Sequence, residues 1–273
     1  MKLLQPIKLK PIRKEYIWGT EDWMLSDLHE EVEHSSLLVK IITARENLSV
    51  QVHPGNEYAL EMENSSGKTE MWYVLDCEPE AFLYYGLKHK ISGNEFLKRI
   101  KNDTILEVCQ KVSVKKGDVF YIPAGLIHAI GKGIKVAEVQ QNSNITYRVY
   151  DYHRQDDNHN FRPLHIKQAE EVAGFMPPLM GHHPMGARKL KEGYYKTLLV
   201  QCPYFQVERI ETEDGMKADI CEKEQSLLVL EGNGKLICDN EEIELKAGDS
   251  IYFSKGITSY EIRGKMKLLL SKA

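Results

Sequence analysis

The stretch Gly117-Asp-Val-Phe-Tyr-Ile-Pro-Ala-Gly-Leu-Ile-His128 recurs without gaps as Gly248-Asp-Ser-Ile-Tyr-Phe-Ser-Lys-Gly-Ile-Thr-Ser259. Each copy starts with a Gly-Asp turn, continues as a short apolar strand and ends in a tight corner with a second glycine. Upstream, Trp72-Tyr-Val-Leu-Asp76 has a counterpart in Leu227-Leu-Val-Leu-Glu231. Such self-similarity predicts two related β units in tandem.

The rest of the chain favours the same architecture. Short β-rich runs, broken by Gly, Pro, Asn and Asp, are typical of a barrel or sandwich. They include Leu37–Ile42, Leu48–Val52, Met71–Leu75, Ala81–Tyr85, Val119–Ile122, Lys135–Val139, Lys196–Val200, Ser226–Leu230, Gly234–Cys238, Ser250–Phe253 and Met266–Leu270. Two segments look helical. Ser92-Gly-Asn-Glu95 fits a capping box that opens a helical insertion near 92–109. A second helix is predicted through Ile166–Ala173, between the two halves.

Composition excludes several classes of protein. The 273 residues carry a net charge of −4 with both signs well mixed, so a nucleic-acid or membrane-surface partner is disfavoured. No apolar run approaches the roughly 18 residues that a spanning helix needs. The start, Met1–Pro6, has no apolar core of a signal peptide. Five cysteines without a C-x-x-C pair indicate reduced thiols and a cytoplasmic protein.

The Gly-Asp…Pro-x-Gly-x-x-His pattern resembles the signature of the cupin superfamily of small jelly-roll barrels. The resemblance implies a mainly β protein of two tandem cupin barrels, with a short helical insertion in the first and a connecting helix. We expect a catalytic domain over 1–163, a connector over 164–189 and a second barrel over 190–273. The second copy has Ser259 in place of His128 and Gln225 in place of Glu70, so the second barrel is expected to lack metal ligands.

Four residues of the first half are candidate metal ligands. Gln51 and His53 point to one face of a predicted strand, because side chains alternate with period two. Glu70 precedes the next strand, and His128 follows the Pro123/Gly125 corner. A single histidine or glutamate of this kind is usually structural or solvated, but a cupin barrel would bring these residues together. An amide, two imidazoles and a carboxylate suit Zn²⁺, with Fe²⁺, Mn²⁺ and Co²⁺ as alternatives.

Several ordered blocks within residues 18–154 resemble a narrower family, the type I mannose-6-phosphate isomerases in their short bacterial form. The blocks are Trp18–Trp23 with Ser26, Leu48–Pro54, Gly67–Tyr73, Pro123–Ile130, Glu138–Ser143 and Thr146–Asp151. The resemblance implies one zinc ion per chain, held by Gln51, His53, Glu70 and His128. It also implies that Arg148 is the active-site arginine, and that Ser49 and Lys68 lie near the sugar phosphate.

The implied reaction interconverts mannose 6-phosphate and fructose 6-phosphate through an enediol(ate), with a small phosphorylated sugar as the only predicted partner. Such a reaction needs a base for the carbon proton and stabilisation of the developing oxyanion. Glu138 is a candidate base, or it orients a metal ligand; His53 and a metal-bound water are other candidate bases. Two alternatives stay open: an iron-dependent cupin oxygenase and a non-catalytic sugar-phosphate-binding cupin. The oligomeric state is not predicted.

Overall fold

The structure is a computed structural model that describes residues 5–155, 158–179, 181–219, 223–239, 241–257 and 259–273. In these ranges the chain forms 21 strands and four helices, so the predicted mainly β class is confirmed. The residues group into two compact units. One contains Lys14–Glu21 and Ile41–His182; the other contains the described residues up to Arg13, Asp22–Lys40 and His183–Ala273.

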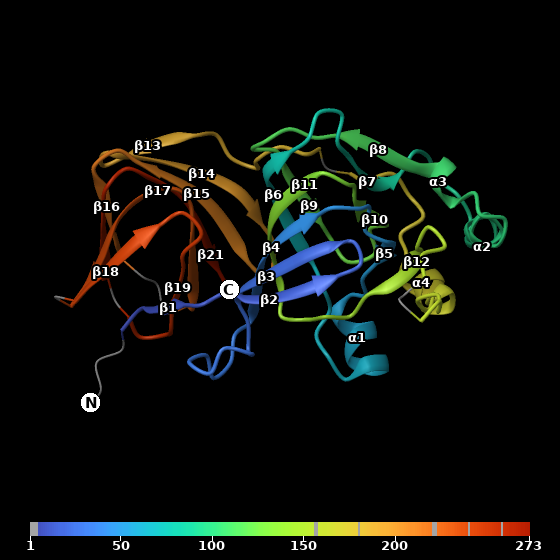
Figure 1. Ribbon diagram of the computed structural model, residues 1–273, viewed down its shortest axis with the longest axis horizontal. Coiled ribbons are helices and arrows are strands. Elements are labelled where there is room, and N and C mark those ends of the chain that lie inside the picture. The colour runs from blue at the N-terminus through green and yellow to red at the C-terminus, as the bar shows by residue number, and fades with distance from the viewer. Residues whose placement is uncertain (1–4, 156–157, 180, 220–222, 240, 258) are drawn as a thin grey trace. The chain divides into compact units, whose positions relative to one another are not determined.

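The unit that contains Ile41–His182 is built on two sheets (Figure 1). One sheet has the order β12-β5-β10-β7-β8. Its strands are β5 (Val50–Val52), β7 (Phe82–Leu87), β8 (Cys109–Ser113), β10 (His128–Ile130) and β12 (Tyr147–Tyr150). The other sheet runs β2-β3-β4-β11-β6-β9. Its strands are β2 (Ile12–Tyr16), β3 (Gly19–Leu25), β4 (Leu37–Ala44), β6 (Glu70–Cys77), β9 (Val119–Ile122) and β11 (Ile134–Gln141). Of these, Ile12–Arg13, Asp22–Leu25 and Leu37–Lys40 belong to the other unit.

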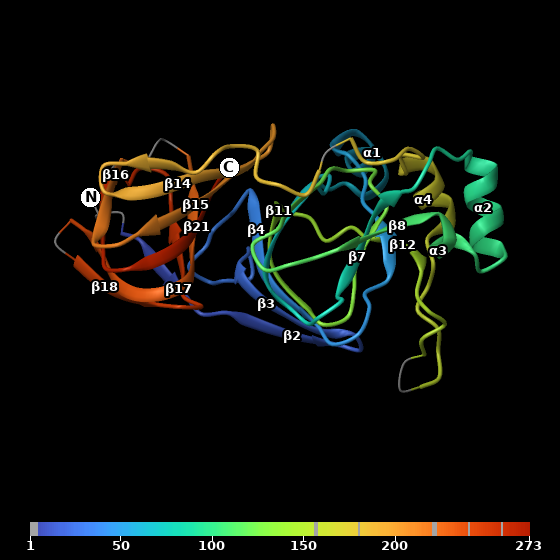
Figure 2. The same cartoon turned by 90° about the horizontal axis from the view of Figure 1, so that it is seen from above.

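Alternation along the strands gives each face of the five-stranded sheet a different partner. Val52, Ile127 and Val149 pack against Phe96, Ile105 and Ala169 of the helices α2, α3 and α4. Figure 2 shows these three helices together beyond β7, β8 and β12. The opposite face supplies Leu83 and Ile130 to a core shared with Trp72 of the other sheet. Gln51, His128 and Arg148 alternate with the helix-facing residues, so they belong to this inner face.

The predicted helical insertion contains α2 (Gly93–Lys101) and α3 (Ile105–Val108). Ser92 caps α2 as predicted, because its side chain accepts the backbone N–H of Glu95 at 3.1 Å. The Glu95 carboxylate is paired with Arg99. The predicted connecting helix is α4 (Ile166–Val172). A further helix, α1 (Asn56–Glu63), was not predicted.

The unit that contains His183–Ala273 is a sheet of ten strands with the order β1-β19-β17-β21-β15-β14-β13, extended by β16, β18 and β20. Its core holds mainly aliphatic residues such as Leu227, Leu236, Ile262 and Leu268. The strands are β1 (Ile7–Leu9), β13 (Lys189–Lys191), β14 (Tyr194–Gln201), β15 (Gln206–Thr212), β16 (Gly215–Asp219), β17 (Gln225–Cys238), β18 (Glu241–Lys246), β19 (Ser250–Phe253), β20 (Ser259–Arg263) and β21 (Met266–Lys272).

One strand is longer than the sequence predicted. Ser226–Leu230 and Gly234–Cys238 were expected as two strands, but both belong to the single strand β17. The pairing of β17 with β21 shifts between Val229 and Glu231, and Gly232 follows at φ 85°. A glycine accepts this left-handed conformation easily, so the strand bends there and changes partners instead of ending.

The internal repeat is also a repeat of structure. Gly117 and Gly248 adopt φ 93° and 90°, values that suit glycine. In the first copy, the Asp118 carboxylate accepts the backbone N–H of Lys115 at 3.0 Å. In the second, Asp249 accepts that of Lys246 at 2.8 Å. The Gly-Asp pair therefore makes the same turn before each apolar strand.

No helix in the described ranges has the length and apolar character needed to cross a membrane. Cys77, Cys109, Cys202 and Cys238 form no disulfide bond, and Cys221 lies outside the described residues.

Candidate metal centre and active site

Three predicted site residues lie in one row across the five-stranded sheet. Gln51 on β5 is paired with His128 on β10 and with Arg148 on β12. Residues directly opposite each other on antiparallel strands present their side chains to the same face. The strand register therefore brings Gln51, His128 and Arg148 together, although 97 sequence positions separate the first from the last.

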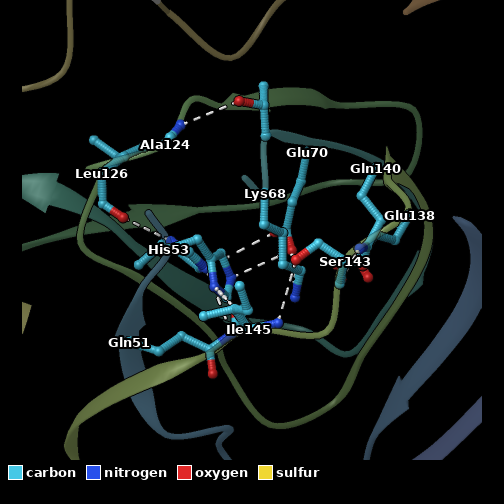
Figure 3. A network of polar contacts seen from close by, with 12 residues as sticks. Gln51, His53, Lys68, Glu70, Ala124, Leu126, Glu138, Gln140, Ser143 and Ile145 are labelled. Atoms are coloured by element: carbon cyan, nitrogen blue, oxygen red, sulfur yellow. Dashed lines mark hydrogen bonds and ion pairs between the residues drawn. The ribbon is translucent and has the colours of Figure 1, made fainter. Parts of the chain in front are cut away.

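Glu70 reaches the same place from the other sheet. It is the first residue of β6, where it pairs with Ile122 and Gln140. One carboxylate oxygen lies 3.3 Å from Nε2 of His53, and the other lies 3.8 Å from Nε2 of His128. All three side chains are buried, and their candidate ligand atoms lie within 4.8 Å of one another (Figure 3).

Backbone carbonyls set the tautomers of both histidines. Nδ1 of His53 lies 2.8 Å from the carbonyl oxygen of Ile145, and Nδ1 of His128 lies 2.8 Å from that of Leu126. A carbonyl only accepts, so each Nδ1 carries the proton and each Nε2 keeps its lone pair. Both Nε2 atoms face Glu70. This is the usual arrangement by which an outer hydrogen bond orients a histidine toward a metal.

The electrostatics keep the imidazoles neutral and the carboxylate charged. Burial, followed by the positive charge of Lys68, lowers the pKa of His53 to about 3, and burial lowers the pKa of His128. Burial alone would raise the pKa of Glu70, but the pKa lies well below its usual range, chiefly because of the positive charge of Lys68. These are the protonation states in which such groups bind a metal.

The three groups fit a divalent cation. Nε2 of His53 and one oxygen of Glu70 are buried and make no hydrogen bond to any described residue, and the other Glu70 oxygen faces the Lys68 ammonium group at 2.9 Å. Converging lone pairs that lack a donor are unfavourable, and a cation between them would satisfy them. Among the described residues, this is the one such group of His, Cys, Asp or Glu side chains.

Gln51 and Ser49 lie beside this cluster. The amide nitrogen of Gln51 is 3.5 Å from Nε2 of His128. Its amide oxygen accepts the hydroxyl of Ser49 at 3.3 Å. A half-turn of the amide exchanges its two ends and would bring the oxygen toward the cluster.

Lys68 is buried at 5% exposure and is not a surface lysine. Its Nζ lies 2.9 Å from a Glu70 oxygen, so its ammonium group faces the candidate metal ligands.

Glu138 is joined to the cluster through a tryptophan. The indole N–H of Trp72, the residue opposite Glu138 in the sheet, donates to the Glu138 carboxylate at 2.8 Å. The Trp72 ring in turn meets the His128 ring edge-on, with centroids 5.4 Å apart. Glu138 is thus buried close to the ligands and touches one of their neighbours.

Arg148 is half-buried at the edge strand of the sheet. Its Nε donates to the carbonyl of Pro163 at 3.2 Å, and its backbone N–H donates to Nδ1 of His165 at 3.2 Å. Burial, and then the charge of Arg162, lower the pKa of Arg148.

Sequence reasoning missed the groups that orient the ligands. Trp72 was used only as part of a strand, of the repeat and of the Gly67–Tyr73 block, without a contact to the site, and the carbonyls of Leu126 and Ile145 carry no side-chain signal. The sequence contains one signal for these groups: Gln140-Gln-Asn-Ser143 is an unusually polar end for a buried strand. The Gln140 amide donates to the carbonyls of Gln141 and Ser143 and so fixes the loop that leads to Ile145.

Comparison with known proteins gives a consistent family. A family described as mannose-6-phosphate isomerase, cupin domain, matches residues 195–273. The chain is 37% identical to mannose-6-phosphate isomerase ManA of Bacillus subtilis, over 98% of each protein. It is 38% identical to a mannose-6-phosphate isomerase of Streptococcus mutans, over 86% of this chain and 73% of that protein. The crystal structure of the mannose 6-phosphate isomerase from Bacillus subtilis superimposes with a TM-score of 0.88, at 29% identity, over 97% of this chain and 99% of that one. The chain belongs to the type I mannose-6-phosphate isomerase family of the cupin superfamily.

Proposed function

We propose that this chain interconverts mannose 6-phosphate and fructose 6-phosphate as a zinc-dependent aldose–ketose isomerase. One observation carries the proposal: two neutral imidazoles aim Nε2 at the buried carboxylate of Glu70, beside the Lys68 ammonium group and on the sheet face that also carries Arg148. The family supplies the reaction, because the relatives are named for it.

His53, Glu70 and His128 would hold one zinc ion, with Gln51 as a fourth ligand through its amide oxygen. Bound zinc would supply Lewis acidity that polarises the sugar carbonyl without a change of redox state. The remaining chemistry belongs to the chain. Two imidazoles and a carboxylate are a ligand set of catalytic rather than structural zinc sites, and the weaker Gln51 amide would be the ligand that gives way to substrate.

The cationic side chains have separate tasks in this proposal. Arg148 presents a rigid fork of donors to the oxygen on which negative charge develops as the enediolate forms. Lys68 adds a positive charge beside Glu70, and Ser49 adds a hydroxyl next to Gln51. Lys68 and Ser49 are proposed to bind the phosphorylated sugar.

Glu138 is the proposed base for the carbon proton. It is buried, and the indole N–H of Trp72 holds one of its oxygens in a fixed direction. A carboxylate oriented in this way can move a proton between neighbouring carbons, which contributes typically 10²–10⁴-fold to a rate.

All of these residues fall within 1–163, which we propose as the catalytic domain, followed by the connector 164–189 and the second domain 190–273. We further propose that each domain is a cupin barrel, because both copies of the Gly-Asp turn take the same conformation. A soluble phosphorylated sugar as substrate fits a cytoplasmic enzyme.

The test is a coupled assay for fructose 6-phosphate formed from mannose 6-phosphate, on purified, chelator-treated and zinc-reconstituted protein. Activity that disappears with the metal and returns with zinc is expected. No fructose 6-phosphate in any sample, with oxygen consumed by the iron-loaded protein, would point to an oxygenase. Binding of the sugar phosphate without turnover would point to a sensor.

Two variants test the assigned roles. His128→Ala is expected to lose bound zinc and activity together, measured by elemental analysis and the coupled assay.

Arg148→Ala is expected to keep zinc and lose turnover. Full zinc content in His128→Ala, or near-native kcat in Arg148→Ala, would contradict the corresponding assignment.

A further inference from the structure

The segment Arg162–His165 holds Arg148 at three points. The carbonyl of Pro163 accepts the guanidinium Nε–H at 3.2 Å. Nδ1 of His165 accepts the backbone N–H of Arg148 at 3.2 Å, and the His165 backbone N–H donates to the Arg148 carbonyl at 2.8 Å. Two contacts fix the backbone of Arg148, and the third reaches its charged group.

This segment is itself fixed by a forked ion pair. Arg162 donates from Nε to one oxygen of Asp151 at 2.7 Å and from a terminal nitrogen to the other at 2.5 Å. Two parallel bonds set the orientation of a guanidinium as well as its distance. Asp151 is only 6% exposed and lies three residues after Arg148, so the contacts close a ring through Arg148, Pro163, Arg162 and Asp151.

The Asp151 carboxylate in this ring also offsets two neighbouring positive charges, those of Arg148 and Arg162. Arg148 and Arg162 are like charges close enough for Arg162 to lower the pKa of Arg148. Asp151 takes up both donor positions of the Arg162 fork and also binds Arg154. Within the described chain, the Nε contact with Pro163 is the one side-chain hydrogen bond of Arg148. Its terminal nitrogens therefore stay available for substrate oxygens.

We propose that the Asp151–Arg162 pair is a positioning device for Arg148: it anchors the Pro163 carbonyl, which aims the Arg148 guanidinium at the reacting oxygens. The inference rests on the proposed function, because it assumes that Arg148 acts on the substrate. Arg162 is a positioning residue and need not touch the sugar. A misplacement of about 1 Å in such a group can lower a rate by about 100-fold.

The test is a double-mutant cycle with Arg162→Gln and Arg148→Lys, assayed with zinc at saturation. Arg148→Lys keeps the charge but has no Nε for Pro163 to hold. Arg162→Gln is expected to lower kcat by about tenfold to 100-fold while zinc content stays at one per chain. In the Arg148→Lys background, Arg162→Gln is expected to cause no further loss, because there is no fork left to aim.

The matched control is Arg188→Gln, which removes another fork, from Arg188 to the two oxygens of Glu211 at 3.2 Å each. It is expected to leave kcat unchanged. Two results would overturn the inference: kcat of Arg162→Gln within twofold of wild type, or equal losses from Arg162→Gln in both backgrounds, which is the signature of a purely structural role.

Failure of the proposed function gives a different pattern. In that case Arg148→Lys turns over like wild type, or the wild type is inactive with zinc bound, whatever Arg162→Gln does. Thermal unfolding of every variant checks folding. If Arg162→Gln does not fold, Arg162→Lys replaces it in the same cycle, since lysine keeps the charge opposite Asp151 without the fork.

Discussion

At the scale of single residues, the variant Glu138→Gln distinguishes a carboxylate that acts as a base from one that orients a metal ligand. Glu138→Gln preserves shape and still offers an oxygen to the Trp72 N–H, whose bond to Glu138 is 2.8 Å long. It removes the ability to take up a proton. We expect bound zinc to be retained and kcat to fall by about 10²–10⁴-fold, measured by elemental analysis and the coupled assay.

The opposite pattern would give Glu138 a different role. Weakened zinc binding with a small change in kcat would mean that Glu138 acts through Trp72 on the orientation of His128. Trp72→Phe serves as the control, since it keeps an aromatic ring against His128 and removes the N–H that binds Glu138.

Asp151 gives a prediction on pH. Burial alone would raise its pKa, but hydrogen bonds from Arg162 and Arg154 outweigh burial and hold the pKa below its usual range. A lowered folded-state pKa contributes stability that is complete above the unfolded value of about 3.9 and is lost as the pH falls. Asp151→Asn should therefore destabilise the protein by about 2 kcal/mol at pH 7, where hydrogen bonds to a charged group count fully.

The cost of Asp151→Asn should shrink toward pH 3, because below about 3.9 the unfolded wild-type chain takes up a proton on Asp151 that the folded protein binds less readily. Thermal unfolding of both proteins with chelator present, at pH 7 and pH 3, measures the difference without a contribution from metal. A melting difference that stays constant or grows as the pH falls would contradict the assignment of Asp151 as the ionised partner of the two arginines.

At the scale of elements, the corner between β9 and β10 ties the fold to the metal ligands. Gly125 adopts φ 86°, its N–H donates to the His53 carbonyl at 2.8 Å, and an added Cβ would lie 3.0 Å from the Val172 carbonyl. Gly125→Ala should lower the melting temperature and weaken zinc binding, because the corner cannot stay in place without strain. Calorimetric titration with zinc and thermal unfolding measure both effects.

Gly193→Ala is the matched control for Gly125→Ala. Gly193 has a similar φ of 89°, but an added Cβ would meet nothing within 4 Å. It should cost stability through backbone conformation alone, by about 1–2 kcal/mol, and leave zinc affinity unchanged. If Gly125→Ala also left the zinc affinity unchanged, the conformation of the corner would have no influence on metal binding.

The elements that were predictable are those with a local cause. The Gly-Asp turns and the Ser92 cap depend on residues within four positions of each other, so the sequence pattern contains them. Helix α1 was missed because its cause is not local. Its N-cap Gly55 makes no side-chain cap bond, Leu60 is 66% exposed, and Tyr58 is bound to Glu171 more than 100 residues away.

The candidate site also combines features that the sequence predicts with features that it cannot predict. His53, Glu70 and His128 could be predicted as a group because their motifs are recognisable, and the structure brings them together. The contacts of Trp72 with Glu138 and of Ile145 with His53 depend on strand register and on a loop conformation. Neither can be derived from spacing, since a shift of one residue would turn those side chains to the other face.

At the scale of the whole molecule, the candidate metal ligands weaken the core unless a cation binds them. His53, Glu70 and His128 bring lone pairs and a charge, which Lys68 offsets only in part, to a place next to Trp72 and Ile130. An ion that binds only the folded state stabilises it by mass action, by about 2.7 kcal/mol at a free concentration 100 times Kd. Zinc should therefore raise the melting temperature of chelator-treated protein, and the increase should grow with zinc concentration.

Hydrogen exchange locates this stabilisation. Zinc should slow exchange most in the strands and loops that carry the ligands and their backbone acceptors, β5, β6, β10 and the loop that ends at Ile145, because their opening would break the coordination. His128→Ala, which lacks one ligand, should show neither the protection nor the rise in melting temperature. Equal protection of wild type and His128→Ala would mean that zinc stabilises the protein elsewhere, and that the convergence of two Nε2 atoms on Glu70 is not where the ion binds.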